Sequence, residues 1–255
     1  MILDDICALS RKRAALLDPS IRKTAEEESY VPQNLLKAVK NCPGEKNAVI
    51  AEIKYTTPSD KTLTSGLNPA DLARSYEMGG ACAVSVLTEP FYFSGSAENL
   101  AKAKTGTQLP ILRKEFIVDE NQIYETYALH ADSVLLIAGV LQDRLPAFIS
   151  LCRSLHIEPL VEVRTLADTK NAIQSGALLT GINNRNLHDM SVDTKITKDL
   201  SGLLRDAGLT VISESGIRTP GDISGLKDFC DGFLIGTALM KSANPQKTLE
   251  AFVCG

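Results

Sequence analysis

The sequence predicts an α/β fold, an eight-stranded parallel (β/α)8 TIM barrel with an N-terminal helical extension, and three observations support this. The length of 255 residues is close to the roughly 250 typical of such barrels. Beyond residue 45, short β-rich runs alternate with helical segments, and no Pro/Ser-rich linker interrupts them. We therefore expect a single domain over residues 1–255, with the extension at 1–45 and the barrel at 46–255.

Eight short runs of apolar and β-branched residues are the predicted strands. Their starts recur every 20 to 34 residues, the size of a βα unit. They are 48–54, 82–88, 109–114, 133–138, 158–163, 178–183, 209–214 and 232–236. Eight alternating units favour a closed barrel over an open sheet, although the order of the strands is not visible in a sequence.

Helix signals lie between the strands. A capping residue precedes a proline in three places, Asn68-Pro69, Thr219-Pro220 and Asn244-Pro245. Two segments resemble capping boxes, Asp119 to Gln122 and Thr165 to Asp168. Three glycines are expected to end helices in left-handed geometry, Gly79, Gly176 and Gly208.

The N-terminal extension is predicted to be helical over residues 2–17, where apolar residues recur at helical spacing, and again around Leu35 to Val39. Such an extension could either close the bottom of the barrel or help to cover its mouth. The Thr-, Ser- and Gly-rich segment Tyr55 to Gly66 follows the first strand and is interpreted as a lid, with a tolerated surface loop as the alternative.

The composition excludes several classes of function. A formal net charge of -4 provides no basic face for nucleic acid or anionic membrane. No apolar run is long enough to span a bilayer, and the acidic start does not resemble a signal peptide, so we expect a cytoplasmic protein. The three histidines lie far apart, and the cysteines form no C-x-x-C pair. We therefore expect neither a metal nor a cofactor.

Charged residues at strand ends are the most informative feature. Lys54 and Lys114 close two apolar runs, Glu52 lies two residues before Lys54 on the same face, and Glu162 closes a third run. Strands of a parallel barrel are covered on both faces, so a charge at the carboxyl end is costly unless it meets a partner or a substrate. Edge strands with surface charges are the alternative. The whole series favours an active site at the carboxyl ends.

Two loops near the end of the chain predict a phosphate site. Ser213-Glu214-Ser215-Gly216-Ile217 follows the seventh predicted strand, and Leu234-Ile235-Gly236-Thr237-Ala238 follows the eighth. These are the positions of the phosphate loops in many barrels, where small residues let backbone N–H groups approach the anion. Glycines that merely turn the chain are the alternative for either loop alone. The pair indicates a phosphorylated small-molecule substrate.

The loop after the sixth predicted strand offers an amide, Asn183, and a guanidinium, Arg185. Arg185 is suited to a carboxylate and Asn183 to a hydroxyl or carbonyl, with a solvated loop arginine as the alternative. With the two lysines and two glutamates, the set contains three cations and two carboxylates. A substrate with one phosphate and one carboxylate complements this excess of buried cations.

The motifs resemble, in order, those of the indole-3-glycerol phosphate synthase family. They are Ala51-Glu52-Ile53-Lys54-Tyr55-Thr56-Thr57-Pro58-Ser59, Leu112-Arg113-Lys114-Glu115-Phe116-Ile117, Leu160-Val161-Glu162-Val163, Gly181 to Leu187 and Ser213 to Ile217. The resemblance covers nearly the whole chain. It implies the tryptophan-biosynthesis step that converts 1-(2-carboxyphenylamino)-1-deoxyribulose 5-phosphate to indole-3-glycerol phosphate, with loss of carbon dioxide and water.

Four positions depart from the family pattern. The family usually has serine at Thr57, aspartate at Glu115 and often serine at Thr237, and many members have a second lysine at Tyr55. The first three keep a hydroxyl or a carboxylate, so the implied function stands. We expect a slightly different geometry at the carboxylate end of the substrate and a less basic first loop.

The resemblance also implies residue roles. Lys114 is the acid of ring closure, Glu162 the proton-transfer carboxylate of the later step, and Lys54, paired with Glu52, contacts substrate anions or the departing hydroxyl. Further substrate contacts are expected from Asn183, Thr57, Phe93, Phe116, Arg185, Leu187 and Glu214, and phosphate contacts from Ser215, Gly216, Gly236 and Thr237. Core packing is the alternative for the two phenylalanines.

Two other functions remain compatible with these residues. A Schiff-base aldolase acting on a phosphorylated sugar would use Lys54 or Lys114 as its nucleophile. A non-catalytic phosphate-binding barrel would not need Glu162 and Lys114 together. A sugar-phosphate isomerase would require an acid–base cysteine where Lys54 stands. We expect a monomer that makes at most transient contact with other enzymes of tryptophan biosynthesis.

Overall fold

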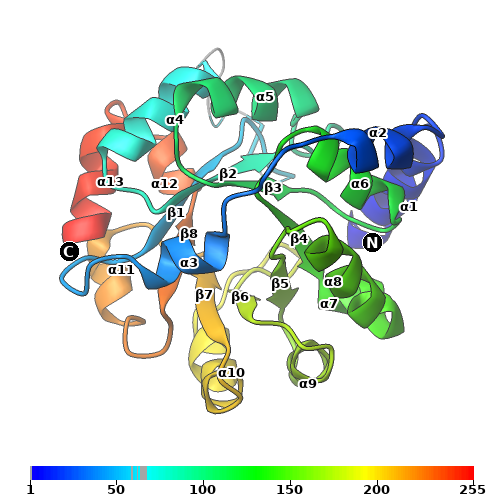
Figure 1. The fold of residues 1–255 in the computed structure, drawn as a ribbon. Helices are drawn as coiled ribbons and strands as arrows, with labels where there is room; N and C mark the ends of the chain where they lie inside the picture. The colour runs from blue at the N-terminus through cyan, green and yellow to red at the C-terminus, as the bar shows by residue number, and fades with distance from the viewer. Residues whose placement is uncertain (1, 59, 62, 64–67) are drawn as a thin grey trace.

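Eight parallel strands form the centre of the molecule and close into a barrel in the order β1 to β8 (Figure 1). The computed structural model describes residues 2–58, 60, 61, 63 and 68–255. The strands are β1 Val49–Ile53, β2 Ala83–Leu87, β3 Ile111–Lys114, β4 Ser133–Ile137, β5 Leu160–Val163, β6 Leu179–Asn183, β7 Thr210–Glu214 and β8 Gly232–Ile235. All eight predicted strands are confirmed, each slightly shorter than expected, and so is the predicted barrel.

Helices cover the outside of the barrel (Figure 1). Those after the first strand are α4 Pro69–Met78, α5 Ala97–Gly106, α6 Asn121–Ala128, α7 Ala138–Leu141, α8 Leu145–Ser154, α9 Leu166–Gln174, α10 Lys195–Asp206, α11 Pro220–Ser224, α12 Thr237–Met240 and α13 Pro245–Cys254. One apolar cluster joins them to the outward side chains of the strands, and a second fills the barrel interior. The inward positions at the carboxyl ends are left for polar groups.

Most predicted helix signals are confirmed by hydrogen bonds. Asn68 and Asn244 cap α4 and α13, and Thr165 forms a capping box with Asp168 at α9. The capping box predicted from Asp119 to Gln122 does not form in that way. Helix α6 begins at Asn121, and the Gln122 carboxamide oxygen accepts hydrogen bonds from the backbone N–H groups of residues 118 and 119.

One predicted helix stop is wrong by a residue. The left-handed glycine after α4 is Gly80, at φ +87°, whereas Gly79 keeps right-handed geometry. Gly176 and Gly208 are left-handed as predicted.

The N-terminal extension contains three helices, α1 Ile2–Ala14, α2 Ile21–Glu27 and α3 Leu35–Lys40. The sequence predicted the first and third but not α2. That helix is polar apart from Ile21 and Ala25, so no apolar stripe marks it in the sequence. It packs against α6, with Ala25 buried and the guanidinium of Arg22 5.5 Å from the ring centre of Tyr124. Packing against a neighbour thus determines this helix.

The extension reaches both ends of the barrel. Leu35 and Val39 of α3 pack with residues at the amino ends of the strands, such as Ala48, and α3 lies in front of the strands in Figure 1. At the other end, Ser10 of α1 donates a hydrogen bond of 2.6 Å to the carbonyl of Phe116, just beyond β3. The extension therefore closes the bottom and supports the mouth.

The predicted lid segment Tyr55 to Gly66 lies partly outside the described residues, which omit 59, 62 and 64–66. Within its described part, Thr57 and Asp60 pair as an isolated antiparallel bridge. Asp60 also lies 2.7 Å from Lys241, which immediately follows α12. The loop after β1 is therefore joined to the loop region after β8.

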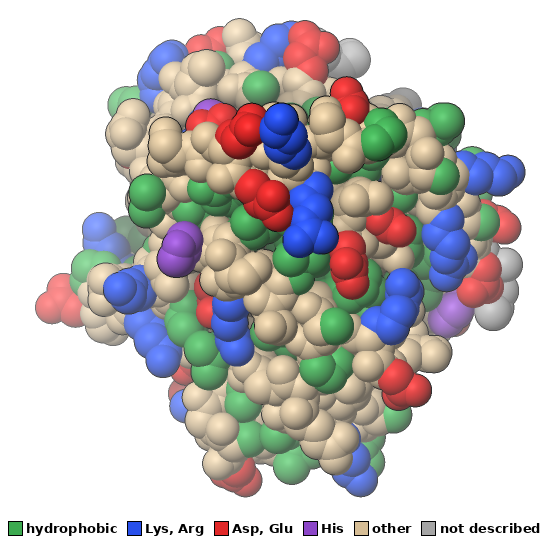
Figure 2. Space-filling view, turned by 45° about the vertical axis from the view of Figure 1, so that its right-hand side comes forward, with side chains coloured by type: hydrophobic (Ala, Val, Ile, Leu, Met, Phe, Trp, Pro, Cys, Tyr) green, Lys and Arg blue, Asp and Glu red, His purple; other side chains and the backbone are tan. Residues whose placement is uncertain are grey.

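Charges of both signs are intermingled on the face of the molecule drawn in Figure 2, with hydrophobic side chains scattered among them. Within the described part of the chain, no helix combines the length and the apolar character needed to cross a membrane.

We predict that Asp132→Ala destabilises the fold by about 3 kcal/mol or more, because it leaves buried donors without an acceptor. Asp132 is fully buried and accepts from Tyr30 and from the backbones of Gln33 and Ile111, while Lys104 lies 2.6 Å away. Urea unfolding measures the loss.

The matched control is Glu26→Ala, which breaks an exposed pair with Arg22 and should cost under about 1 kcal/mol. Equal losses would show that Asp132 does not anchor the extension.

Candidate active site

The predicted site residues surround one cavity of about 460 Å³ at the carboxyl ends of the strands. Loops after β1, β2, β3, β6, β7 and β8 contribute to its wall, together with the last residues of several strands. The cavity is lined by Glu52, Lys54, Thr57, Phe93, Lys114, Phe116, Glu162, Asn183, Arg185, Leu187, Glu214, Ser215, Gly216, Gly236 and Thr237. The structure thus brings every predicted residue to one place, and their individual roles stay predictions.

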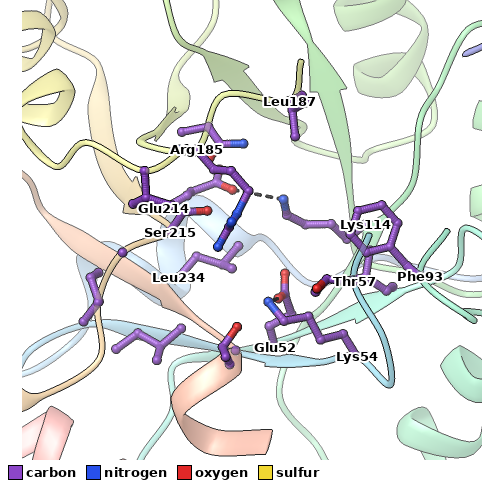
Figure 3. A pocket seen from close by; sticks show the side chains of 18 of the residues that line it. Glu52, Lys54, Thr57, Phe93, Lys114, Arg185, Leu187, Glu214, Ser215 and Leu234 are labelled. Carbon is purple, nitrogen blue, oxygen red and sulfur yellow. Dashed lines mark hydrogen bonds and ion pairs between the residues drawn. The ribbon is translucent and has the colours of Figure 1, made fainter. Parts of the chain in front are cut away.

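Lys114 lies at the centre of this cavity, at the end of β3 (Figure 3). Its Nζ is 3.0 Å from Glu214 Oε2 and 3.5 Å from Glu162 Oε2. The two carboxylates come from β7 and β5, because the closed barrel places inward side chains of different strands in one layer. One ammonium group is therefore shared by two buried carboxylates.

The electrostatics of this cluster follow from burial and short distances. Burial lowers the pKa of Lys114, but Glu214, Glu162 and Glu52 together outweigh it, and the net pKa is raised well above the ordinary value. Lys114 is consequently a stable ammonium at neutral pH. For the Glu52 carboxyl group, burial alone would raise the pKa. The neighbouring cations, of which Lys54 has the largest effect, outweigh burial, and the net pKa is lowered.

The Glu214 carboxyl group differs from that of Glu52 in the direction of its pKa shift. Burial raises its pKa to about 7, against the opposing attraction of Lys114. Its side chain is 1 % exposed, and neither carboxylate oxygen accepts a hydrogen bond of ordinary geometry within the described part of the chain. A carboxyl group with these properties can take up or release a proton near neutral pH.

Glu52 and Lys54 form a second pair, with Lys54 Nζ 2.5 Å from Glu52 Oε1 (Figure 3). Gly236 lies directly against them: a Cβ there would be 2.4 Å from Glu52 Oε1 and 2.9 Å from Lys54 Nζ. The sequence analysis explained this glycine by a bound phosphate or by a turn of the chain. The structure adds a further reason, since any side chain at position 236 collides with the ion pair.

The loop after β6 is held by its own amide side chains. Asn183 Oδ1 accepts from the backbone N–H of Arg185 at 2.9 Å, and Arg185 donates to the carbonyl of Met190. The neighbouring Asn184 is fully buried and donates to the carbonyl of Ser215, which fixes the first predicted phosphate loop. Asn183 thus orients Arg185, and Asn184 connects the loops after β6 and β7.

Phe93 and Phe116 form the aromatic side of the cavity. Their ring centres are 6.0 Å apart and their planes are inclined by 27°. Phe93 lies on the loop after β2, where buried Glu89 accepts hydrogen bonds from the backbones of Phe91, Tyr92 and Phe93. A flat aromatic group of a ligand fits beside such a pair.

Sequence reasoning missed several residues that line the same cavity, among them Leu234, Arg218 and Lys241. Leu234 and Arg218 adjoin the two glycine loops, so their positions beside those motifs were an available signal. No sequence signal pointed to Lys241, because the position of its side chain depends on where α12 ends. Asn184 was also unassigned, although it lies between two residues that were singled out. Among the residues described, no group of three or more His, Cys, Asp and Glu side chains is arranged to hold a metal ion.

The fold and the cluster define the class of protein: a (β/α)8-barrel enzyme with buried acid–base groups at the carboxyl ends of its strands. A family profile for indole-3-glycerol phosphate synthase matches residues 5–252. The chain belongs to the indole-3-glycerol phosphate synthase family. It is therefore a carboxy-lyase of tryptophan biosynthesis, as its motifs implied.

Two relatives illustrate the similarity. Indole-3-glycerol phosphate synthase of Carboxydothermus hydrogenoformans is 40 % identical over 99 % of this chain and 100 % of its own length. The Aquifex aeolicus enzyme of the same name is 45 % identical over 90 % of each chain.

Solved structures show the fold alone. Thiamine phosphate pyrophosphorylase from Pyrococcus furiosus has a TM-score of 0.61 at 15 % identity, covering 82 % of this chain and 94 % of its own. The tryptophan synthase alpha chain from Legionella pneumophila has a TM-score of 0.59 at 14 % identity, covering 86 % and 96 %.

We predict that the Glu214 carboxyl titrates with a pKa of about 7, and that Lys114→Met raises this pKa further by removing the opposing cation. Carboxyl carbon shifts in protein labelled at glutamate measure both values, with Glu214→Gln identifying the signal. Because folding keeps this group protonated above its unfolded value of about 4.5, its contribution to stability falls as pH rises from there towards 7. A pKa below 5 in the unaltered protein would contradict this electrostatic account.

Proposed function

We propose that this chain closes the indole ring of 1-(2-carboxyphenylamino)-1-deoxyribulose 5-phosphate in the cavity described above, with Lys114 as the acid of the first step. The single observation that carries the proposal is the Lys114 ammonium, held 3.0 Å from Glu214 and 3.5 Å from Glu162 inside this cavity. The Ser215–Gly216 and Gly236–Thr237 loops line the same cavity. An acid and an anion site are thus on the same cavity.

In the first step an aromatic carbon attacks the ketone carbon, and a carbon–carbon bond forms while the carbonyl oxygen takes a proton from Lys114. A ketone is a poor electrophile until an acid hydrogen-bonds or protonates its oxygen. The carboxylate on the attacking ring carbon then leaves as carbon dioxide, and its bonding electrons return to the ring. In the last step the carbon–oxygen bond of the remaining hydroxyl breaks and the neighbouring carbon loses a proton, and Glu162 takes that proton and passes it to the departing hydroxyl, which leaves as water.

Binding is divided between the two sides of the cavity. Ser215 and Gly216 have φ values of +67° and +88°, and Asn184 holds the Ser215 carbonyl, so the next N–H group points the opposite way. That geometry supports backbone donors for the phosphate. Arg185 supplies a cation for the substrate carboxylate and the Phe93–Phe116 pair supports the anthranilate ring, while Lys54 lies beside the Gly236 loop, where it can contact the phosphate.

A Schiff-base aldolase is less well supported by this geometry. An amine nucleophile must lose its proton, and enzymes achieve this by lowering the lysine pKa. The three carboxylates around Lys114 do the reverse and stabilise the ammonium. Borohydride added with substrate would trap a covalent adduct if the aldolase mechanism operated. A non-catalytic phosphate-binding barrel gives no reason for this buried cluster, and its distinguishing result is absence of turnover.

Lys114→Met is expected to lower turnover by about 10²- to 10⁴-fold, because the ketone loses its positioned acid. Indole fluorescence measures the product directly, and the chain contains no tryptophan, which keeps the background low. Lys102→Met is the matched control, since Lys102 pairs with Glu98 on the surface of α5 and should leave turnover unchanged. Circular dichroism confirms folding. Unaltered turnover in folded Lys114→Met protein would remove this residue from the mechanism.

The two anion sites can be separated by comparing inorganic phosphate with the full substrate. Thr237→Val removes a hydroxyl from the phosphate loop and should weaken both ligands by about 10-fold or more, since a hydrogen bond to a charged group contributes about 1.5–3 kcal/mol. Arg185→Ala should weaken the substrate far more than phosphate, because only the substrate carries the carboxylate. Competition by inorganic phosphate in the fluorescence assay gives both affinities. Equal losses for both ligands in the Arg185 variant would show that the sites are misassigned.

A further inference from the structure

Gly181 is a strand residue whose backbone conformation does not require glycine. It lies in the middle of β6, paired with Glu162 of β5 and Ile212 of β7, and is completely enclosed by the barrel. Its φ lies outside the left-handed region. Glycine inside a strand lowers stability and packs nothing, and it often marks a place where another group approaches closely. The group that approaches here is identifiable.

The position that a Cβ of residue 181 would take is filled by the side chain of Glu214. The three nearest heavy atoms would all belong to that residue: Oε1 at 1.8 Å, Cδ at 2.9 Å and Cγ at 3.5 Å. Cβ atoms essentially never come closer than 3.0 Å to a neighbour. Glu214 pairs in register with Asn183, two residues beyond Gly181 on the same face of β6, so its side chain reaches back over the glycine.

We propose that Gly181 is a positioning residue for the reaction: the absence of its side chain opens the slot in which the Glu214 carboxylate lies 3.0 Å from the Lys114 ammonium. The inference rests on the proposed role of Lys114 and extends it to a residue that touches neither substrate nor reacting atoms. Neither oxygen of Glu214 accepts a hydrogen bond of ordinary geometry among the described residues. The slot and the ion pair with Lys114 therefore fix where the carboxylate lies.

A side chain at position 181 would displace the carboxylate rather than the backbone, because the end of Glu214 is the nearest movable group. The side chains of Lys114, Glu162 and Glu214 are 13 %, 5 % and 1 % exposed, so a displaced Glu214 carboxylate can move only within this cluster or into the cavity that it lines. Its movement must change the contact with Lys114. The geometry of the acid is thereby coupled to the absence of one methyl group on β6.

The experiment is Gly181→Ala in the full chain, with steady-state kinetics and the Glu214 carboxyl titration as readouts. We expect kcat to fall about 10- to 100-fold, as for other misplacements of about 1 Å, with KM changed less and the Glu214 pKa moved from its value in the unaltered protein. Gly232→Ala is the matched control. A Cβ there meets Ala48 O at 2.9 Å and Ile212 Cδ1 at 3.0 Å, so packing suffers without contact to the cluster. It should lower the melting temperature and leave kcat and the Glu214 titration unchanged.

A double-mutant cycle tests whether Gly181→Ala lowers kcat through the Glu214 side chain. In a Glu214→Ala background the slot is empty, so adding Gly181→Ala should cause no further loss of kcat. The same fold-loss in both backgrounds would overturn the proposal, as would an unmoved Glu214 titration in Gly181→Ala. If Gly181→Ala does not fold, the double variant decides: it folds if Glu214 is the only obstacle and fails if the methyl group clashes elsewhere.

The titration also separates this proposal from the proposed function. A shifted Glu214 pKa with unaltered kcat would show that the methyl group displaces the carboxyl group but would overturn the proposal, because Gly181 would then position no group that the reaction uses. A shifted pKa with reduced kcat supports both.

Discussion

The burial of an ammonium group among carboxylates is the constraint on which the rest of the site depends. Parallel strands covered on both faces leave no water for a charge at their carboxyl ends, so each charge must be neutralised by another one. Lys114 meets Glu214 at 3.0 Å and Glu162 at 3.5 Å, while Lys54 neutralises Glu52. Only a closed barrel brings β1, β3, β5 and β7 to one point, which is why residues more than a hundred positions apart form a single acid–base cluster.

The N-terminal extension supports this cluster indirectly, through the strand that carries Lys114. Arg113, the preceding residue, points away from the cavity and donates to Thr126 and to the carbonyl of Gln122 on α6. Arg113 also forms an ion pair with Glu125, and Glu125 forms a second ion pair, at 3.0 Å, with Arg13 of α1. Gln122 in turn donates to Ser10 of α1, whose hydroxyl binds the Phe116 carbonyl. The orientation of β3 and of the loop beyond it is therefore fixed from outside the barrel by α1 and α6.

Most of the fold was predictable because periodic patterns and strand-end residues act locally. All eight strands and the Asn68, Thr165 and Asn244 caps follow from neighbours in the chain. The predictions that failed depend on distant contacts: α2 is stabilised by α6, and the turn after α4 uses Gly80 instead of Gly79. The site shows the same division. Residue identities marked the cavity, but the raised pKa of Glu214 could not be inferred, since it arises from burial that only the closed barrel creates.

The charge balance of the cavity also had to be revised once its geometry was known. The sequence argued for an excess of cations from three cations and two carboxylates, leaving Glu214 uncounted although it was expected to contact substrate. With Glu214 included, the centre is balanced when all groups are ionised, and Arg218 adds positive charge at the wall, where Lys241 is paired with Asp60. An incoming phosphate and carboxylate would make a fully ionised centre strongly negative. A carboxyl group with a pKa of about 7 removes part of that repulsion by taking up a proton, so the burial that raises the pKa of Glu214 also helps the cavity to accept a ligand with both a phosphate and a carboxylate.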